Sequence, residues 1–168
     1  MIYKFYKNSK IQLYLGSFLT QVSNFLLYVY IVNILSIDQV AVLAIIDGIL
    51  ITLPFILTLV SEKTSVISYF SFGKIKGEKF FIESYKITFI TFLIGLILWV
   101  PIQVIVNKNF VILSILIMLT AMFIGFYNIQ FQFYLVSMSY ANIFKMQLIR
   151  AGFLFISGFV LNILVDNS

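Results

Sequence analysis

The chain has 168 residues, of which 62% are hydrophobic and 10% are charged. Because soluble domains carry about 25% charged residues, this composition excludes a water-soluble fold and indicates a protein whose main solvent is lipid. The absence of Cys and His excludes disulfides, thiolate or imidazole metal sites and the usual base of neutral-pH catalysis.

Long apolar stretches recur along the sequence. A transmembrane helix needs about 20 mostly apolar residues, and hydropathy predicts about five such spans here. We therefore predict an all-α, polytopic transmembrane helix bundle, formed by a single domain of residues 1–168. The predicted spans cover residues 11–35, 40–60, 87–106, 110–133 and 146–165.

The segment 61–86, between the second and third predicted spans, is polar but patterned. Its apolar residues continue a helical face, and the stretch from Gly73 to Gly77 interrupts it. We predict a helical hairpin that projects into the cytoplasm. We interpret Gly73 and Gly77 as a chain reversal, and Ala121 and Gly125, four residues apart, as a close helix contact.

Basic residues lie almost entirely on one side of the predicted spans. Of the 11 Lys and Arg residues, only Lys108 falls on the opposite side. Positive charge marks the cytoplasmic side of membrane proteins, so we expect a plasma-membrane protein with a cytoplasmic N-terminus. The net charge of +5 is thereby explained by topology and by contact with anionic membrane lipids, without nucleic acid.

Four polar side chains share one face of the first predicted span. Ser17, Gln21, Asn24 and Tyr28 are spaced by four, three and four residues, which places them in one stripe across the membrane midplane. A stripe of this kind either lines a hydrated cavity or forms hydrogen bonds with neighbouring helices.

Asp47 is the clearest ionisable residue at membrane depth. It lies about seven residues into the second predicted span, or roughly 10 Å from the outer surface. Gly48 beside it and Pro54 further on weaken the local backbone. Asp47 is either a proton, cation or ligand site in a central cavity, or a carboxylate bonded to neighbouring helices or reached by water.

Signals for catalysis are missing from the sequence. We find no acidic pair for Mg²⁺-pyrophosphate chemistry, no Gly-rich phosphate loop and no Ser-His-Asp set. We therefore expect no enzyme activity, no metal site and no cofactor.

The order of several short motifs resembles the opening of the polysaccharide (O-antigen-type) flippases, which are relatives of the multidrug and toxic-compound extrusion transporters. The first helix begins with Gly16-Ser17-Phe18-Leu19 and ends with Asn33-Ile34-Leu35-Ser36. The resemblance continues with the motifs Asp38-Gln39-Val40-Ala41-Val42-Leu43-Ala44, Ser65-Val66-Ile67-Ser68-Tyr69-Phe70, Glu78-Lys79, Phe133-Tyr134-Leu135 and Ala141-Asn142-Ile143-Phe144-Lys145.

The resemblance implies a transporter of two lobes that exposes a central cavity alternately to each side of the membrane. The chain resembles an incomplete N-terminal lobe, so we expect a fragment, a truncated product or a small protein that needs a second lobe or partner subunit. The implied cargo is a lipid-linked oligosaccharide, with Gln21, Asn24 and Asp47 in the cavity.

Two further functions remain open at this stage. One is a cation-coupled exporter of small molecules, with Asp47 as the coupling carboxylate. The other is a non-transporting membrane subunit or scaffold that holds a glycan-assembly partner by the cytoplasmic hairpin.

Overall fold

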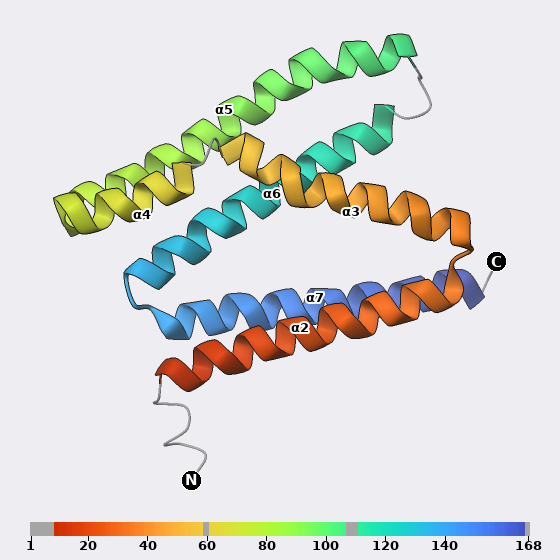
Figure 1. The fold of residues 1–168 in the computed structure, drawn as a ribbon, viewed down its shortest axis with the longest axis horizontal. Helices are drawn as coiled ribbons and strands as arrows, with labels where there is room; N and C mark the ends of the chain where they lie inside the picture. The colour runs from red at the N-terminus through yellow and green to blue at the C-terminus, as the bar shows by residue number, and fades with distance from the viewer. Residues whose placement is uncertain (1–8, 59–60, 107–110, 167–168) are drawn as a thin grey trace. The chain divides into compact units, whose positions relative to one another are not determined.

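The computed structural model describes residues 9–58, 61–106 and 111–166 (Figure 1). Within these residues the chain forms α-helices and no strand. The helices are α2 (Ser9–Ile34), α3 (Ile37–Thr58), α4 (Ser61–Phe72), α5 (Lys74–Val106), α6 (Val111–Val136) and α7 (Tyr140–Asp166).

Four of these helices are long and apolar enough to cross a membrane: α2, α3, α5 and α6. The chain is therefore an all-α polytopic membrane protein, as the sequence predicts. With 12 residues, α4 is too short to span a bilayer. The predicted fifth span, 146–165, falls within α7, where the side chains of 157–166 lie outside the description, so it stays a prediction.

The chain divides into two compact units, which are described separately below. The first contains α2, the start of α3 and α7, and the second contains the rest of α3 with α4, α5 and α6. In the first unit α2 and α7 pack side by side along most of their length (Figure 1). In the second unit α5 packs against both α4 and α6.

The start of α3 is fixed by a reciprocal pair of hydrogen bonds. The Gln39 main-chain N–H donates to Ser36 Oγ at 3.4 Å, and the Ser36 N–H donates to Gln39 Oε1 at 3.0 Å. This arrangement is the capping box, which satisfies two backbone donors at a helix N-terminus. It explains why α3 begins at Ile37, before the predicted start near Val40.

The α4–α5 hairpin turns at a single residue, Gly73, whose φ of +82° favours glycine. Gly77 lies inside α5, against Tyr69 of α4: a Cβ atom at Gly77 would lie 2.5 Å from Tyr69 Cα. The interpretation of Gly77 as part of the chain reversal is therefore wrong. The residue is a helix-packing glycine, and α5 runs unbroken from Lys74, well before the predicted start of a span at Ile87.

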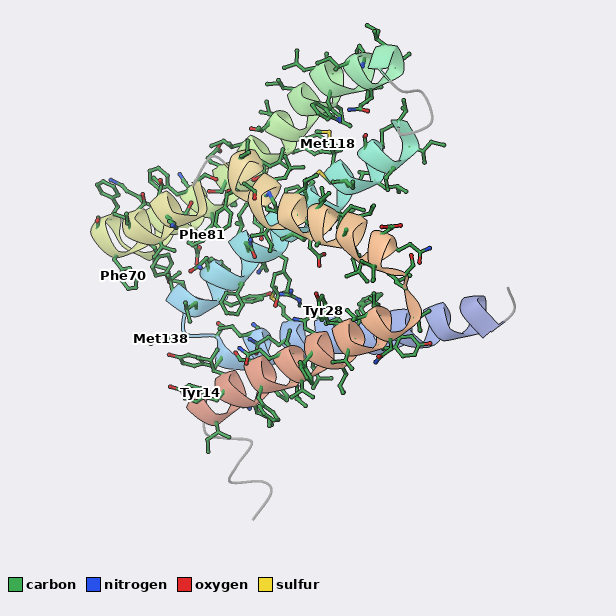
Figure 2. All side chains as sticks on the ribbon, turned by 45° about the vertical axis from the view of Figure 1, so that its right-hand side comes forward. Tyr14, Tyr28, Phe70, Phe81, Met118 and Met138 are labelled. Atoms are coloured by element: carbon green, nitrogen blue, oxygen red, sulfur yellow. The ribbon has the colours of Figure 1, made fainter. Side chains whose placement is uncertain are left out.

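Two apolar clusters hold the second unit together. One joins α3, α5 and α6 through Leu57, Phe92 and Met118, and the other joins α5 and α6 through Phe81 and Ile129. Figure 2 labels one residue of each cluster, Met118 of the first and Phe81 of the second. Ala121 is fully buried in the first cluster, which agrees with the predicted helix contact at Ala121 and Gly125.

Candidate functional site

The contact between α2 and α7 combines small and polar residues with the fully buried Ile143 of α7, and we call it the α2–α7 seam. On α2, Gly16, Thr20 and Ser23 are buried, with spacings of four and three residues that place them on one helical face. On α7, Gln147 and Ala151 are buried opposite them. Small residues allow two helices in a membrane to approach closely.

Gln147 takes part in two hydrogen bonds across this seam. Its Nε2 donates to Ser17 Oγ at 3.0 Å, and its main-chain oxygen accepts a bond from Thr20 Oγ1 at 3.3 Å. A Cβ atom at Gly16 would lie 2.1 Å from Gln147 Oε1. Gly16 is therefore the residue that makes room for the Gln147 amide.

The Gln147 Oε1 atom is buried and has no hydrogen-bond partner among the described residues. A buried acceptor without a partner costs about 1–3 kcal/mol. The Gln147 amide in the seam thus has a partner for its Nε2 donor but none, among the described residues, for its Oε1 acceptor.

The structure separates the predicted stripe into two parts. Ser17 belongs to the seam, where it accepts the bond from Gln147, whereas Gln21, Asn24 and Tyr28 are exposed on α2. These three lie near the middle and in the C-terminal half of the candidate membrane span Ile11–Ile34. We call Gln21, Asn24 and Tyr28 the polar face of α2; Figure 2 labels Tyr28 on it.

A third side of α2 is apolar and also exposed. Phe18 is 61% exposed and Phe25 is 66% exposed, and both lie about a quarter of a helical turn from the polar face. These rings suit contact with lipid chains. An amide or hydroxyl on the polar face does not, because a polar group without a partner in hydrocarbon costs free energy.

Asp47 lies at the middle of α3. Because α3 begins at Ile37, Asp47 is about 15 Å along the helix axis from the N-terminus of α3, at about 1.5 Å per residue. Its side chain is exposed and forms no ion pair or hydrogen bond with the described residues. It shares a helical face with Pro54 and Thr58, which are buried.

A second set of small polar residues lies where α3, α5 and α6 meet. Thr58 and Thr88 are buried, and a Cβ atom at Gly125 would lie 3.2 Å from Thr58 Cγ2 and 3.4 Å from Thr88 Cγ2. Asp47 therefore lies on the side of α3 that packs, two to three turns further on, against the helices of its own unit. An intramembrane carboxylate is expected on such an inner side.

The α4–α5 hairpin contains a serine pair that the sequence analysis missed. Ser65 Oγ and Ser84 Oγ are 2.6 Å apart, so one hydroxyl donates to the other. The remaining proton is donated to a main-chain oxygen, either from Ser84 to Phe80 at 2.9 Å or from Ser65 to Ser61 at 2.8 Å. Ser61, Ser65 and Ser68 repeat at spacings of four and three, which is the signal that could have predicted a polar helix contact.

The second unit also contains a cavity of about 460 Å³ between α3, α5 and α6. Its lining includes Ile49, Trp99 and Met118, and Ser114 is the one hydroxyl residue among the lining residues. Such a lining suits hydrocarbon and offers little to a sugar. Elsewhere in the unit, Tyr85 of α5 donates a hydrogen bond to Gln130 Oε1 on α6.

Comparison with protein-family models, with curated proteins and with solved structures finds no match. The class of the chain, an all-α polytopic membrane protein, therefore rests on its own helices. Among the described residues, no group of three or more His, Cys, Asp or Glu side chains could hold a metal ion.

Proposed function

We propose that the chain forms part of a membrane transporter that resembles lipid-linked oligosaccharide flippases and works by alternating access. The observation that supports this proposal is the polar face of α2, formed by Gln21, Asn24 and Tyr28. This face is exposed at membrane depth beside an apolar face, although α7 already covers a third side of the helix. A helix with an unsatisfied polar face in a bilayer requires a hydrated cavity or another protein surface.

The chemistry of the polar face suits sugar hydroxyls. The amides of Gln21 and Asn24 each offer two donors and one acceptor oxygen, and the Tyr28 hydroxyl offers both. The face carries no cationic side chain, so the pyrophosphate of a lipid-linked sugar would find its positive charge elsewhere, in a second lobe or partner subunit. The lipid tail of the cargo would stay in the bilayer.

The α2–α7 seam gives this proposal a mechanical basis. A transporter that alternates between two states moves rigid groups of helices against one another. The hydrogen bonds from Gln147 to Ser17 and from Thr20 to the main chain of α7 tie the two helices into one such group. The polar face would then move with α7 as one body.

We also propose that the N-terminus lies in the cytoplasm and that the membrane is the plasma membrane. The distribution of basic residues supports this orientation. With one cysteine at Asn109 or at Gly73, an impermeant thiol reagent added to intact cells should label Asn109→Cys and spare Gly73→Cys. The opposite pattern would reverse the orientation.

Cysteine labelling also tests the cavity, because the chain has no cysteine of its own. Single substitutions at Gln21 and Asn24 should react with a water-soluble maleimide, since thiolate, the reactive form, needs water. The matched controls are Phe18→Cys and Phe25→Cys, on the apolar face of the same helix, which should react poorly. Equal, low reactivity at all four positions would show that another protein surface covers the polar face.

A transport assay tests the cargo. Proteoliposomes that contain the chain, with its partner if one co-purifies, receive a lipid-linked oligosaccharide with a dithionite-sensitive fluorophore. Flipping should expose the inner-leaflet fraction to dithionite, and Asn24→Leu should slow this step more than Phe25→Leu. Efficient labelling of the polar face without any flipping would favour a non-transporting subunit or a different cargo.

Asp47 supports a second candidate, the cation-coupled exporter. It is a carboxylate at mid-membrane with no ion-pair or hydrogen-bond partner among the described residues, and such a residue can bind and release a proton or cation. Asp47→Asn should then abolish the dependence of transport on an ion gradient. Unchanged dependence would exclude this role for Asp47.

A further inference from the structure

The α4–α5 hairpin exposes large apolar side chains next to lysines. Ile75 is 77% exposed, Phe70 is 69% exposed and Ile67 is 65% exposed. We call this surface the hairpin surface and define it by its exposed apolar and basic residues: Lys63, Ile67, Phe70, Phe72, Lys74, Ile75, Lys76, Lys79, Phe80, Ile82 and Lys86.

The apolar and basic residues alternate along the same helical faces. On α5, Ile75, Lys79, Ile82 and Lys86 follow one another at spacings of four, three and four residues, so they form one stripe. On α4, Lys63 is followed by Ile67 and Phe70 at the same kind of spacing. A face that mixes Phe, Ile and Lys is typical of helices that lie in a membrane interface.

The inner sides of the hairpin are already packed, with Ser61 Oγ as a buried hydroxyl that has no hydrogen-bond partner among the described residues. Ser65 and Ser84 bond to each other, Gly77 receives Tyr69, and Phe81 contacts Phe133 of α6 with ring centroids 5.3 Å apart. The hairpin surface therefore faces outward because the packed interior is elsewhere. Figure 2 shows Phe70 near the end of the hairpin.

The length of α5 brings this surface to the membrane. Its 33 residues span about 50 Å at about 1.5 Å per residue, whereas the hydrocarbon core is about 30 Å thick and the whole bilayer about 40–45 Å. A helix longer than the bilayer accommodates by tilting. Tilting of α5 brings the hairpin closer to the headgroups, because the second arm of the hairpin is the N-terminal part of α5 itself.

We propose that the hairpin surface docks on the headgroup layer of the membrane and binds anionic phospholipids. The apolar rings enter the interface, and the ammonium groups of Lys74, Lys76 and Lys79 meet the negative headgroups, whereas Lys86 is paired with Glu83 at 2.8 Å. The charge of the hairpin supports anionic phospholipid as its partner, because residues 61–86 carry five lysines and three glutamates. Basic segments beside a membrane span attract anionic lipid by about 1 kcal/mol per Lys. The hairpin thus lies on the membrane rather than projecting into the cytoplasm.

A tryptophan reporter tests the docking. The chain has one tryptophan, Trp99, so Trp99→Phe combined with Phe70→Trp gives a single reporter on the hairpin surface. The protein is reconstituted into symmetric vesicles of phosphatidylcholine and phosphatidylglycerol, in which both orientations meet the same headgroups. One of the two lipids at a time carries brominated chains, which quench a nearby tryptophan.

The expected result is quenching by both brominated lipids and stronger quenching, at equal mole fraction, by the brominated phosphatidylglycerol. Replacing three lysines together (Lys74→Gln, Lys76→Gln, Lys79→Gln) should remove the excess from the anionic lipid. Lys145→Gln, an exposed lysine on α7, is the control and should leave it unchanged. Because the attraction is electrostatic, added salt should also reduce the excess.

Three outcomes would overturn the proposal. Quenching by acrylamide but not by brominated lipid would place the hairpin surface in water. A blue-shifted emission without quenching by either reagent would show that a protein, such as a partner or a second copy, covers the surface. Equal quenching by both lipids, unaffected by the lysine substitutions, would remove the preference for anionic lipid. Ile75→Trp in the same background is a second reporter if Phe70→Trp does not fold.

Discussion

The α2–α7 seam and the α4–α5 hairpin each bring two helices together around a glycine, but they differ in which atoms pack against that glycine. In the hairpin, the atom that fills the space at Gly77 is the Cα of Tyr69, part of the backbone. In the seam, the atom nearest Gly16 is the end of the Gln147 side chain. Each contact also contains one buried polar atom without a hydrogen-bond partner among the described residues, Ser61 Oγ in the hairpin and Gln147 Oε1 in the seam. The hairpin is the tighter contact because backbone fills the space at its glycine, and the seam has room to adjust.

The largest effect is expected for Gly77→Ala. The new Cβ would meet the Tyr69 backbone at 2.5 Å, and overpacking of this kind costs about 1–3 kcal/mol. The free energy of unfolding, measured by SDS titration in mixed micelles, should fall by this amount. Gly152→Ala is the control, because among the described residues beyond its own helical turn no atom lies within 4 Å of a Cβ at this position. The better helix propensity of Ala should leave this variant neutral or stabilised. Equal effects of the two substitutions would contradict the close packing of the hairpin.

The next effect concerns Gly16→Ala, whose cost should depend on Gln147. In the native chain the new Cβ displaces the amide, whereas in a Gln147→Ala background the space is free. A double-mutant cycle on the unfolding free energy should therefore give a coupling of about 0.5–3 kcal/mol. Additive effects would show that the amide does not fill the space at Gly16.

A smaller effect should distinguish the two partners of the seam hydrogen bond. Ser17→Ala leaves the Gln147 amide without its acceptor and should destabilise the chain. Gln147→Leu removes a hydrogen bond worth about 0.6 kcal/mol together with a buried unpaired acceptor, and replacement of such a group by an apolar one can be nearly neutral. Thermal unfolding in detergent should rank Ser17→Ala below Gln147→Leu, and the reverse order would mean that Gln147 is fully satisfied.

The smallest effect is expected in the hairpin serine pair. In Ser65→Ala or Ser84→Ala, the remaining hydroxyl keeps a bond to the main chain, Ser84 to Phe80 or Ser65 to Ser61. Each substitution should therefore lower the unfolding free energy by only about 0.6 kcal/mol. A loss near that of Gly77→Ala would show that the hydroxyls, and not the close approach, determine the strength of the hairpin.

The sequence predicts the positions of four membrane-crossing helices, because hydropathy depends only on composition over a long window. It also predicts the reversal at Gly73 and the contact at Ala121. It does not reveal that a single unbroken helix starts at Lys74, because two glycines among lysines suggest a break that extends to Gly77.

The structure shows where the residues of the predicted stripe lie, whereas their role in a cavity stays a prediction. The stripe of Ser17, Gln21, Asn24 and Tyr28 follows from helical spacing, and the structure places these residues on one helix as expected. The spacing does not say that Ser17 turns to α7, because its partner Gln147 lies 130 residues away. Gly16 and Thr20 were not predicted as contact residues for a related reason. Small residues contribute little to hydropathy, so their role in packing is visible only once the partner helix is known.

That separation of 130 residues has a consequence for biogenesis. At a synthesis rate of about 5–20 residues per second, roughly 7–26 s pass between the emergence of Ser17 and that of Gln147. During this interval α2, the least apolar of the four candidate spans at a mean hydropathy of 1.4, must stay in or near the insertion machinery without its partner helix. Depletion of a membrane insertase should therefore reduce the yield of the folded chain, and strengthening α2 with Gln21→Leu should restore insertion at the expense of the polar face.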